Sequence, residues 1–231
     1  MPTDRQKSIL RKIIETFVKD AQPLASGVLV NKMKDKVSSA TMRNEMVTLE
    51  KEGYIFQPHT SAGRVPTEKA YQFYIENYLN KSKGLSEMEK KVLQEIENQE
   101  GEDRVRIKNF AKKIAALSKQ GVMVTFSACD NYYTGLSNIF AQPEFSSADL
   151  VINLSKIIDQ MDSNIIDLDE KDFDEPEILI GSKNPIGCDC SIVVFKYELG
   201  KYRGIIALIG PMRMNYQKNY ALIKESIKLL K

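Results

Sequence analysis

The sequence predicts an α+β protein built in two parts. Three amphipathic helical segments and a short hairpin occupy residues 1–66, whereas β-rich runs appear only after residue 120. Of the 231 residues, 42% are hydrophobic and 28% are charged, which is typical of a globular protein with a buried core. This length allows one large or two small domains.

The first predicted helix has the clearest apolar stripe. Its apolar residues recur at spacings that place them on one helical face. They are Ile9, Leu10, Ile13, Ile14, Phe17 and Val18. Thr3 is the expected N-cap, and the helix is expected to stop before Pro23, because proline disfavours helical geometry in the residue before it.

Two further helices are predicted before residue 53. A short one follows Ser26, and a longer one begins at Ser38 or Ser39 as the N-cap and ends at Gly53. The expected buried residues of the short helix are Val28, Leu29 and Met33. The expected buried residues of the longer helix are Met42, Met46 and Leu49.

A two-stranded hairpin follows these helices in the prediction. Residues 54–56 and 64–66 form short β-like runs, and the turn-forming sequence QPHTSAG separates them. Three helices followed by a hairpin are the element order of a winged helix-turn-helix. We therefore expect a winged helix-turn-helix domain over residues 1–80.

The remaining chain is expected to form a linker and an α+β domain. Thr67 caps a helix that reaches Leu79, and residues 81–103 form a helical linker with a charged helix and the polar stretch 97–103. The domain spans residues 104–231. Its first helix is expected to place Val105, Ile107, Phe110, Ile114 and Leu117 inward. Further helices are predicted at 150–161 and 216–231, and strands at 122–126, 177–180, 191–199 and 202–210.

Charge is distributed unevenly along the chain. Residues 1–80 contain 12 basic and 9 acidic side chains, whereas residues 121–231 contain 11 basic and 15 acidic ones. A basic front part is typical of a protein that meets a polyanion there.

The start of the third helix offers side chains that suit duplex DNA. The second helix of a helix-turn-helix lies in the major groove, and its N-terminal residues reach base edges. Arginine pairs with guanine, asparagine with adenine, and alanine or a threonine methyl group suits thymine. The candidate residues are Ser38, Ser39, Ala40, Thr41, Arg43 and Asn44. A solvated helix face with capping serines is the alternative interpretation.

The hairpin tip is a second candidate DNA contact. It is small and polar and has a cation at its edge, which would let it lie along the DNA backbone and place arginine in a narrow minor groove. The candidate residues are His59, Thr60, Ser61, Gly63 and Arg64. An ordinary surface turn is the alternative interpretation.

Other classes of protein find little support in the sequence. Three cysteines cannot form a closed set of disulfides, which favours a reducing cytoplasm, and no apolar run is long enough to span a membrane. The pair Cys188 and Cys190 lacks a second cysteine pair for a zinc site, and His59 is the single histidine. With no phosphate-binding or dinucleotide motif, we expect no cofactor, no metal and no enzymatic activity.

Three blocks of the sequence resemble one family. The run VSSATMRNEMVTLEKEGYIFQPHTSAGRVPTEKAYQFY, residues 37–74, resembles the N-terminal domain of the heat-inducible transcription repressor HrcA, and QPHTSAGR is its most specific part. LSNIFAQPEFSSADL at 136–150 resembles the middle of that family. ILIGSKNP at 178–185 and GIIALIGPMRMNYQKNYALI at 204–223 resemble its C-terminal end.

The resemblance implies a sequence-specific repressor of chaperone genes. Members of the family bind an inverted-repeat operator as homodimers, have a GAF-like C-terminal part with an inserted dimerisation region, and are kept active by the GroEL chaperonin. Here only about ten residues, 127–136, separate the VMVTF strand from LSNIFAQPEF. The resemblance therefore implies a shortened form with a reduced GAF-like domain. The alternative hypothesis is a module that senses a ligand or a chaperonin, with secondary DNA binding.

Overall fold

The computed structural model describes residues 2–33, 37–97, 101–127, 130–145, 152, 168, 174–185, 187 and 190–230. The chain divides into two compact units, Met1–Leu79 and Asn80–Lys231, which we call unit 1 and unit 2. The expected linker 81–103 falls within unit 2. The helix predicted at 150–161 lies, apart from Ile152, outside the described residues, as do Cys188 and Asp189.

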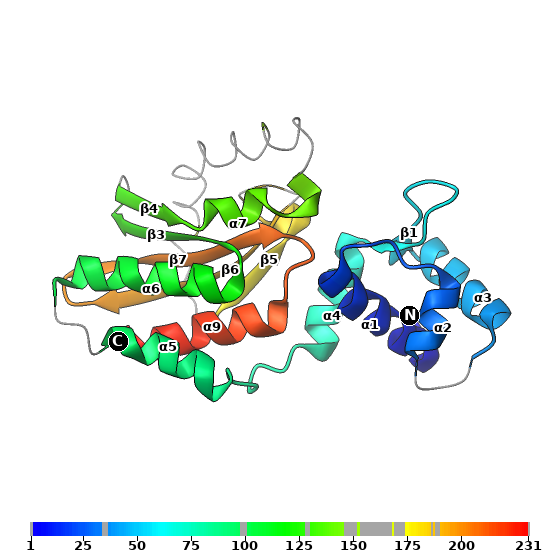
Figure 1. Ribbon diagram of the computed structural model, residues 1–231, viewed down its shortest axis with the longest axis horizontal. Helices are drawn as coiled ribbons and strands as arrows, with labels where there is room; N and C mark the ends of the chain where they lie inside the picture. Colours follow the sequence, from blue (N-terminus) through cyan, green and yellow to red (C-terminus); the bar gives the residue numbers. More distant parts are fainter. Residues whose placement is uncertain are drawn as a thin grey trace. The chain divides into compact units, whose positions relative to one another are not determined.

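Unit 1 contains four helices and a two-stranded hairpin among its described residues (Figure 1). The helices are α1 (Asp4–Asp20), α2 (Ser26–Lys32), α3 (Ser39–Lys51) and α4 (Glu68–Tyr78). The strands β1 (Ile55–Phe56) and β2 (Val65–Pro66) pair antiparallel between α3 and α4. This order matches the predicted succession of elements.

Helix α1 confirms both predicted ends. The Thr3 hydroxyl accepts a hydrogen bond from the Gln6 N–H, and the Gln6 side chain accepts one from the Thr3 N–H, which forms a capping box. At the other end, Ala21 adopts a left-handed conformation and closes the helix before Pro23. The apolar residues Ile9, Leu10, Ile13 and Ile14 are buried, as their spacing predicts.

The short helix α2 buries less than predicted. Leu29 is fully buried, but Val28 is 48% exposed and Met33 is half-buried as the C-cap residue. The prediction that Val28 lies in the core is wrong. A helix of seven residues makes two turns, so its single inward face has room for Leu29, and the preceding residue points to solvent.

A third chain segment joins the hairpin. Leu24, in the connection between α1 and α2, exchanges two backbone hydrogen bonds of 2.9 Å with Arg64. Gly63 lies directly against this bridge, because a Cβ atom at residue 63 would come within 2.3–2.6 Å of the Leu24 backbone. The end of the hairpin is thus fixed to the segment that precedes α2, a contact that the sequence did not predict.

Unit 2 is a five-stranded antiparallel sheet with helices packed on it (Figure 1). The strands are β3 (Gly121–Ser127), β4 (Asp130–Thr134), β5 (Glu177–Ile180), β6 (Cys190–Leu199) and β7 (Tyr202–Pro211), in the order β4-β3-β7-β6-β5. The helices are α5 (Glu87–Glu97), α6 (Asp103–Ser118), α7 (Leu136–Phe140) and α9 (Tyr216–Leu229), with short 3-10 turns at Pro143–Phe145 and Gly181–Lys183. The mixed composition confirms the α+β class.

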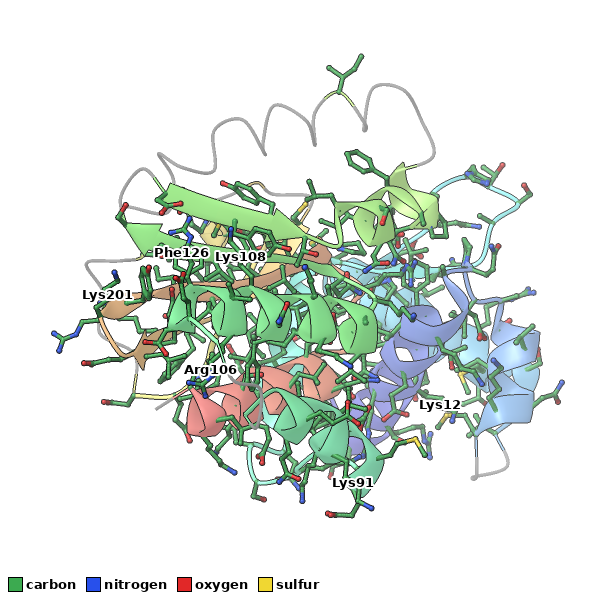
Figure 2. All side chains as sticks on the ribbon, turned by 60° about the vertical axis from the view of Figure 1, so that its left-hand side comes forward. Lys12, Lys91, Arg106, Lys108, Phe126 and Lys201 are labelled. Atoms are coloured by element: carbon green, nitrogen blue, oxygen red, sulfur yellow. The ribbon has the colours of Figure 1, made fainter. Side chains whose placement is uncertain are left out.

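The two faces of the sheet bury different partners. Because side chains alternate along a strand, Ile192 and Val194 of β6 share one face with Ile205 and Ala207 of β7, and Ile139 of α7 packs there. Helices α6 and α9 contact the strands along the opposite face (Figure 1). Figure 2 shows Lys108 on the side of α6 toward β4, where its Nζ lies 5.0 Å from the centroid of the Tyr132 ring. The sheet therefore has a helix-covered face on each side.

Three features of unit 2 differ from the predictions. Strand β4 and helix α7 were not predicted; both lie in the short segment after β3, where half-buried residues such as Tyr132 and Tyr133 give no clear alternation. Val105 was expected to be buried but is 51% exposed, because it shares the helical face of the exposed Lys112 and Ala116, away from the buried side of α6. The hairpin predicted at Gly200-Lys201 is confirmed by the pairing of Leu199 with Tyr202.

Helices α5 and α9 are joined by an ion pair. The Lys218 ammonium lies 2.8 Å from Glu89 Oε1, and the Ser86 hydroxyl donates to the same carboxylate at 2.7 Å. These two contacts lower the pKa of Glu89 to about 2, from an ordinary value of 4.5. The carboxylate is 22% exposed, so solvent weakens the pair only in part.

We expect Gly63→Ala to lower the free energy of unfolding by about 1–3 kcal/mol, because the added methyl group overpacks the Leu24 backbone. Thermal or urea denaturation measures this change. Gly27→Ala is the matched control: a Cβ atom there meets nothing within 4 Å, and alanine should raise the stability of α2 by about 0.5–1 kcal/mol. Equal stability of the two variants would contradict the close contact at Leu24.

We expect Glu89→Gln to lower the free energy of unfolding by about 1 kcal/mol at pH 7. The folded-state pKa is depressed, so the contribution of the ion pair is complete above about pH 4.5 and disappears as the pH falls toward 2. Urea denaturation across this pH range should therefore show the variant and the parent converging. Glu87→Gln is the control, because that carboxylate is 82% exposed and its ion-pair partner among the described residues is Lys90 of the same helix. A pH-independent difference would argue against the Lys218 contact.

Candidate nucleic-acid interface

Helix α3 presents its first turn to solvent. Burial of Met42, Met46 and Leu49 fixes the rotation of this helix, so the side chains of Arg43 and Asn44 point away from the core and are exposed. Ser38, Ser39 and Ala40 at the helix start are exposed as well. The structure therefore brings the predicted residues of this helix to one accessible end.

Ser38 and Thr41 serve the helix cap. The Ser38 hydroxyl accepts a hydrogen bond of 3.1 Å from the Thr41 N–H and lies 2.9 Å from the Thr41 hydroxyl. This contact satisfies a backbone donor that the first turn of a helix otherwise leaves open. The remaining predicted residues, Ser39, Ala40, Arg43 and Asn44, are the ones that stay turned toward solvent.

The carboxylates of α3 are matched by cations. Glu45 accepts a hydrogen bond of 2.9 Å from the Gln6 side chain and lies 3.6 Å from the Arg5 guanidinium. Glu50 pairs with Arg64. No described residue pairs with the Arg43 side chain, so its charge adds to the positive end of the helix dipole near Ser39. The exposed end of α3 thus favours an anionic partner.

The hairpin tip projects from unit 1 (Figure 1). His59, Thr60 and Ser61 are exposed, and a turn closes where the Ala62 N–H donates to the His59 carbonyl at 2.8 Å. The predicted tip residues are therefore on the surface.

Arg64 lies at the base of the tip instead of at its edge. Its Nη2 is 2.9 Å and its Nε 3.3 Å from Glu50 Oε2, and the side chain is 21% exposed. The guanidinium is directed toward α3, where it joins the hairpin to that helix. Its expected contact with the DNA backbone stays a prediction, since forming it would require this ion pair to open or to share the guanidinium.

A hollow of about 360 Å³ connects α3 with the tip. Residues from three segments line it: the start of α2, the outward side of α3 and the hairpin. They include Ser26, Arg43, Val47, Ser61, Gly63 and Arg64. The two predicted groups of residues thus form one continuous concave surface with two guanidinium groups along it.

Three residues that line or support this surface are not predicted from the sequence. Leu24 and Glu50 contact Arg64, and Gln57 lies at the first position of the tip. The pairs Leu24–Arg64 and Glu50–Arg64 depend on tertiary folding and leave no periodic signal. Gln57 has a visible signal, because it begins the QPHTSAGR run, but the predicted DNA contacts of the tip begin at His59.

The other candidate sites give no comparable arrangement. Cys190 is buried, and the described part of the chain contains no cluster of three or more metal-binding side chains. Unit 2 has a hollow of about 710 Å³ beside the β6–β7 hairpin, lined by Lys196, Tyr197 and Ile227 among others. Among the helices that the structure describes, none has the length and apolar character needed to cross a membrane.

Comparison with known proteins places these features in a family. The chain is 39% identical over 128 residues to the heat-inducible transcription repressor HrcA of Kineococcus radiotolerans; this match covers 54% of this chain and 36% of that relative. It is 47% identical over 91 residues to the protein of the same name from Thermobifida fusca, and that match covers 39% of this chain and 26% of the relative. The matches thus span between about a quarter and about a third of the length of these curated relatives.

A solved structure shares the fold of the whole chain. It is the crystal structure of a hypothetical protein at 2.2 Å resolution, with a TM-score of 0.80 and 17% sequence identity over 100% of this chain and 98% of that one. The family model described as the HrcA protein C terminal domain matches residues 37–219, which include α3, the hairpin and all five strands of the sheet. The chain belongs to the HrcA family.

Proposed function

We propose that the chain is a winged helix-turn-helix transcriptional repressor of heat-shock genes that binds an inverted-repeat DNA operator. The observation that carries this proposal is the outward-facing first turn of α3, residues 39–44, beside an exposed hairpin tip. Membership of the HrcA family supports it, because the relatives carry the name heat-inducible transcription repressor.

Helix α3 is the proposed recognition helix. Ser39, Ala40, Arg43 and Asn44 would face base edges in the major groove, while the free N–H groups of the first turn would meet a phosphate. Ser38 and Thr41 would hold the helix start in shape and contact phosphate through their hydroxyl groups. Arg43 combines exposure with a charge that no described residue neutralises, so it is the strongest candidate for a direct base contact.

The hairpin is the proposed wing. His59, Thr60, Ser61 and Gly63 would lie along the DNA backbone. Arg64 would act mainly by holding the wing against α3 through Glu50, so that both elements meet the duplex together. The hollow between them matches the need for one continuous surface.

Residues 1–80 are the proposed DNA-binding domain, residues 81–103 a helical connection, and residues 104–231 a reduced GAF-like effector and dimerisation domain. A dimer would place two recognition helices about one helical turn, or a multiple of it, apart on the operator. The α+β part is also the proposed site for regulation by a GroEL-type chaperonin.

The operator test uses the full chain and two DNA duplexes. One carries the inverted repeat that precedes the chaperone operon in the genome encoding this chain, and the other has the same base composition in scrambled order. We expect at least about 10³-fold tighter binding of the inverted repeat, measured by gel shift at physiological salt, because specific protein–DNA complexes exceed non-specific ones by this factor or more. Equal affinity for both duplexes would overturn the proposed function.

We expect Arg43→Ala to weaken operator binding by about 1–3 kcal/mol and to relax selectivity at one base pair, since a bidentate arginine–guanine contact contributes this amount. Titration against operators substituted at each position measures both effects. Lys12→Ala is the control, because this cation lies on α1 and is not among the residues that line the hollow (Figure 2). An equal loss on every sequence would instead place Arg43 on a phosphate.

A further inference from the structure

The side chain of Gln57 bridges the hairpin tip from within. Its amide nitrogen donates one hydrogen bond to the Thr60 carbonyl at 2.9 Å and a second to the Ala62 carbonyl at 2.8 Å. Both N–H groups of a single amide are therefore used to hold backbone atoms three and five residues further along. Gln57 is half-buried, directly after β1, so the two bonds start from a fixed point of the hairpin.

The rest of the tip has few other constraints. One backbone bond, from the Ala62 N–H to the His59 carbonyl, closes the turn. Among the described residues, the side chains of His59, Thr60 and Ser61 have no hydrogen-bond or ion-pair partner. The segment is anchored again only at Gly63 and Arg64, against Leu24. The conformation of the exposed residues thus depends on Gln57.

The direction of the two bonds has a consequence for the tip surface. Gln57 binds carbonyl oxygens, which draws the acceptors of Thr60 and Ala62 inward. Carbonyl oxygens that face a phosphate backbone repel it, whereas hydroxyl, imidazole and N–H groups attract it. Gln57 thus holds these carbonyl oxygens away from the surface. The hydroxyl, imidazole and N–H groups that stay exposed on the tip can donate hydrogen bonds to the phosphate oxygens of DNA.

We infer that Gln57 is a positioning residue for DNA binding, which fixes the wing in its bound conformation before DNA arrives. This inference rests on the proposed function. Ordering a free backbone segment costs conformational entropy, so a tip that is already ordered binds DNA with a smaller entropic loss. If one backbone residue of the tip loses its order, we expect binding to become roughly tenfold weaker.

Gln57→Met tests the bridge with little change of size or charge. Methionine keeps the length of the side chain but has no N–H donor. We expect the full chain carrying this substitution to bind the inverted-repeat duplex about tenfold more weakly. Gln72→Met is the matched control, because Gln72 lies on α4, outside the hairpin, and its side-chain amide donates a hydrogen bond to the Glu68 carboxylate. Thermal denaturation of both variants separates a local effect from general unfolding.

A second background makes the role of the tip explicit. The triple variant His59→Ala, Thr60→Ala, Ser61→Ala removes the side chains that Gln57 is inferred to position. We expect it to weaken operator binding, and we expect Gln57→Met to cause less than twofold further loss in that background. A purely structural role of Gln57 would give the same tenfold loss in both backgrounds, which would overturn the inference.

The outcomes distinguish the inference from the proposed function. If the parent chain binds the operator no better than the scrambled duplex, the proposed function fails. If the parent discriminates but Gln57→Met binds as tightly as the parent, only the positioning role is overturned. An unchanged affinity of the triple variant also overturns it, since the tip would then contribute no contact.

Discussion

The packing of Met42, Met46 and Leu49 against the core of unit 1 determines which side chains α3 presents to solvent. These residues lie at spacings of four and three, so their burial sets the rotation of the helix about its own axis. Arg43 and Asn44 follow Met42 directly and must therefore face outward. A rotation of one residue would bury Arg43 and expose Met42. The candidate interface is thus a consequence of the core, and the Ser38 cap only determines where the helix begins.

The elements with strong local signals could be predicted from the sequence. The stripe of α1, the serine before α3 and the glycine in the β6–β7 turn each specify a conformation through a few neighbouring residues. Strand β4 lacked such a signal, because its half-buried residues belong to the sheet edge and do not alternate between core and solvent. It is stabilised by pairing with β3, which no window of sequence reveals.

The candidate interface divides in the same way. Exposure of Arg43 and of the tip residues followed from local pattern and turn chemistry. The position of Arg64 did not follow from the sequence. A cation in a polar turn fits a DNA contact and an ion pair with Glu50 equally well, and only the fold brings α3 and the hairpin together. Gln57 is a similar case: the sequence places a glutamine beside the tip but gives no information on the carbonyl groups to which it donates.

These contacts make the hairpin part of the support that holds α3 in place. Arg64 ties the hairpin to Glu50 of α3, and its backbone ties the same position to Leu24 before α2. Gly63 is required beside that bridge because no side chain fits there, and Gln57 shapes the loop beyond it. A change at any of these positions would move the tip relative to α3 without altering the exposed side chains of Arg43, Asn44 or His59. The geometry of the surface is therefore controlled from beneath it, by residues whose partners lie inside unit 1.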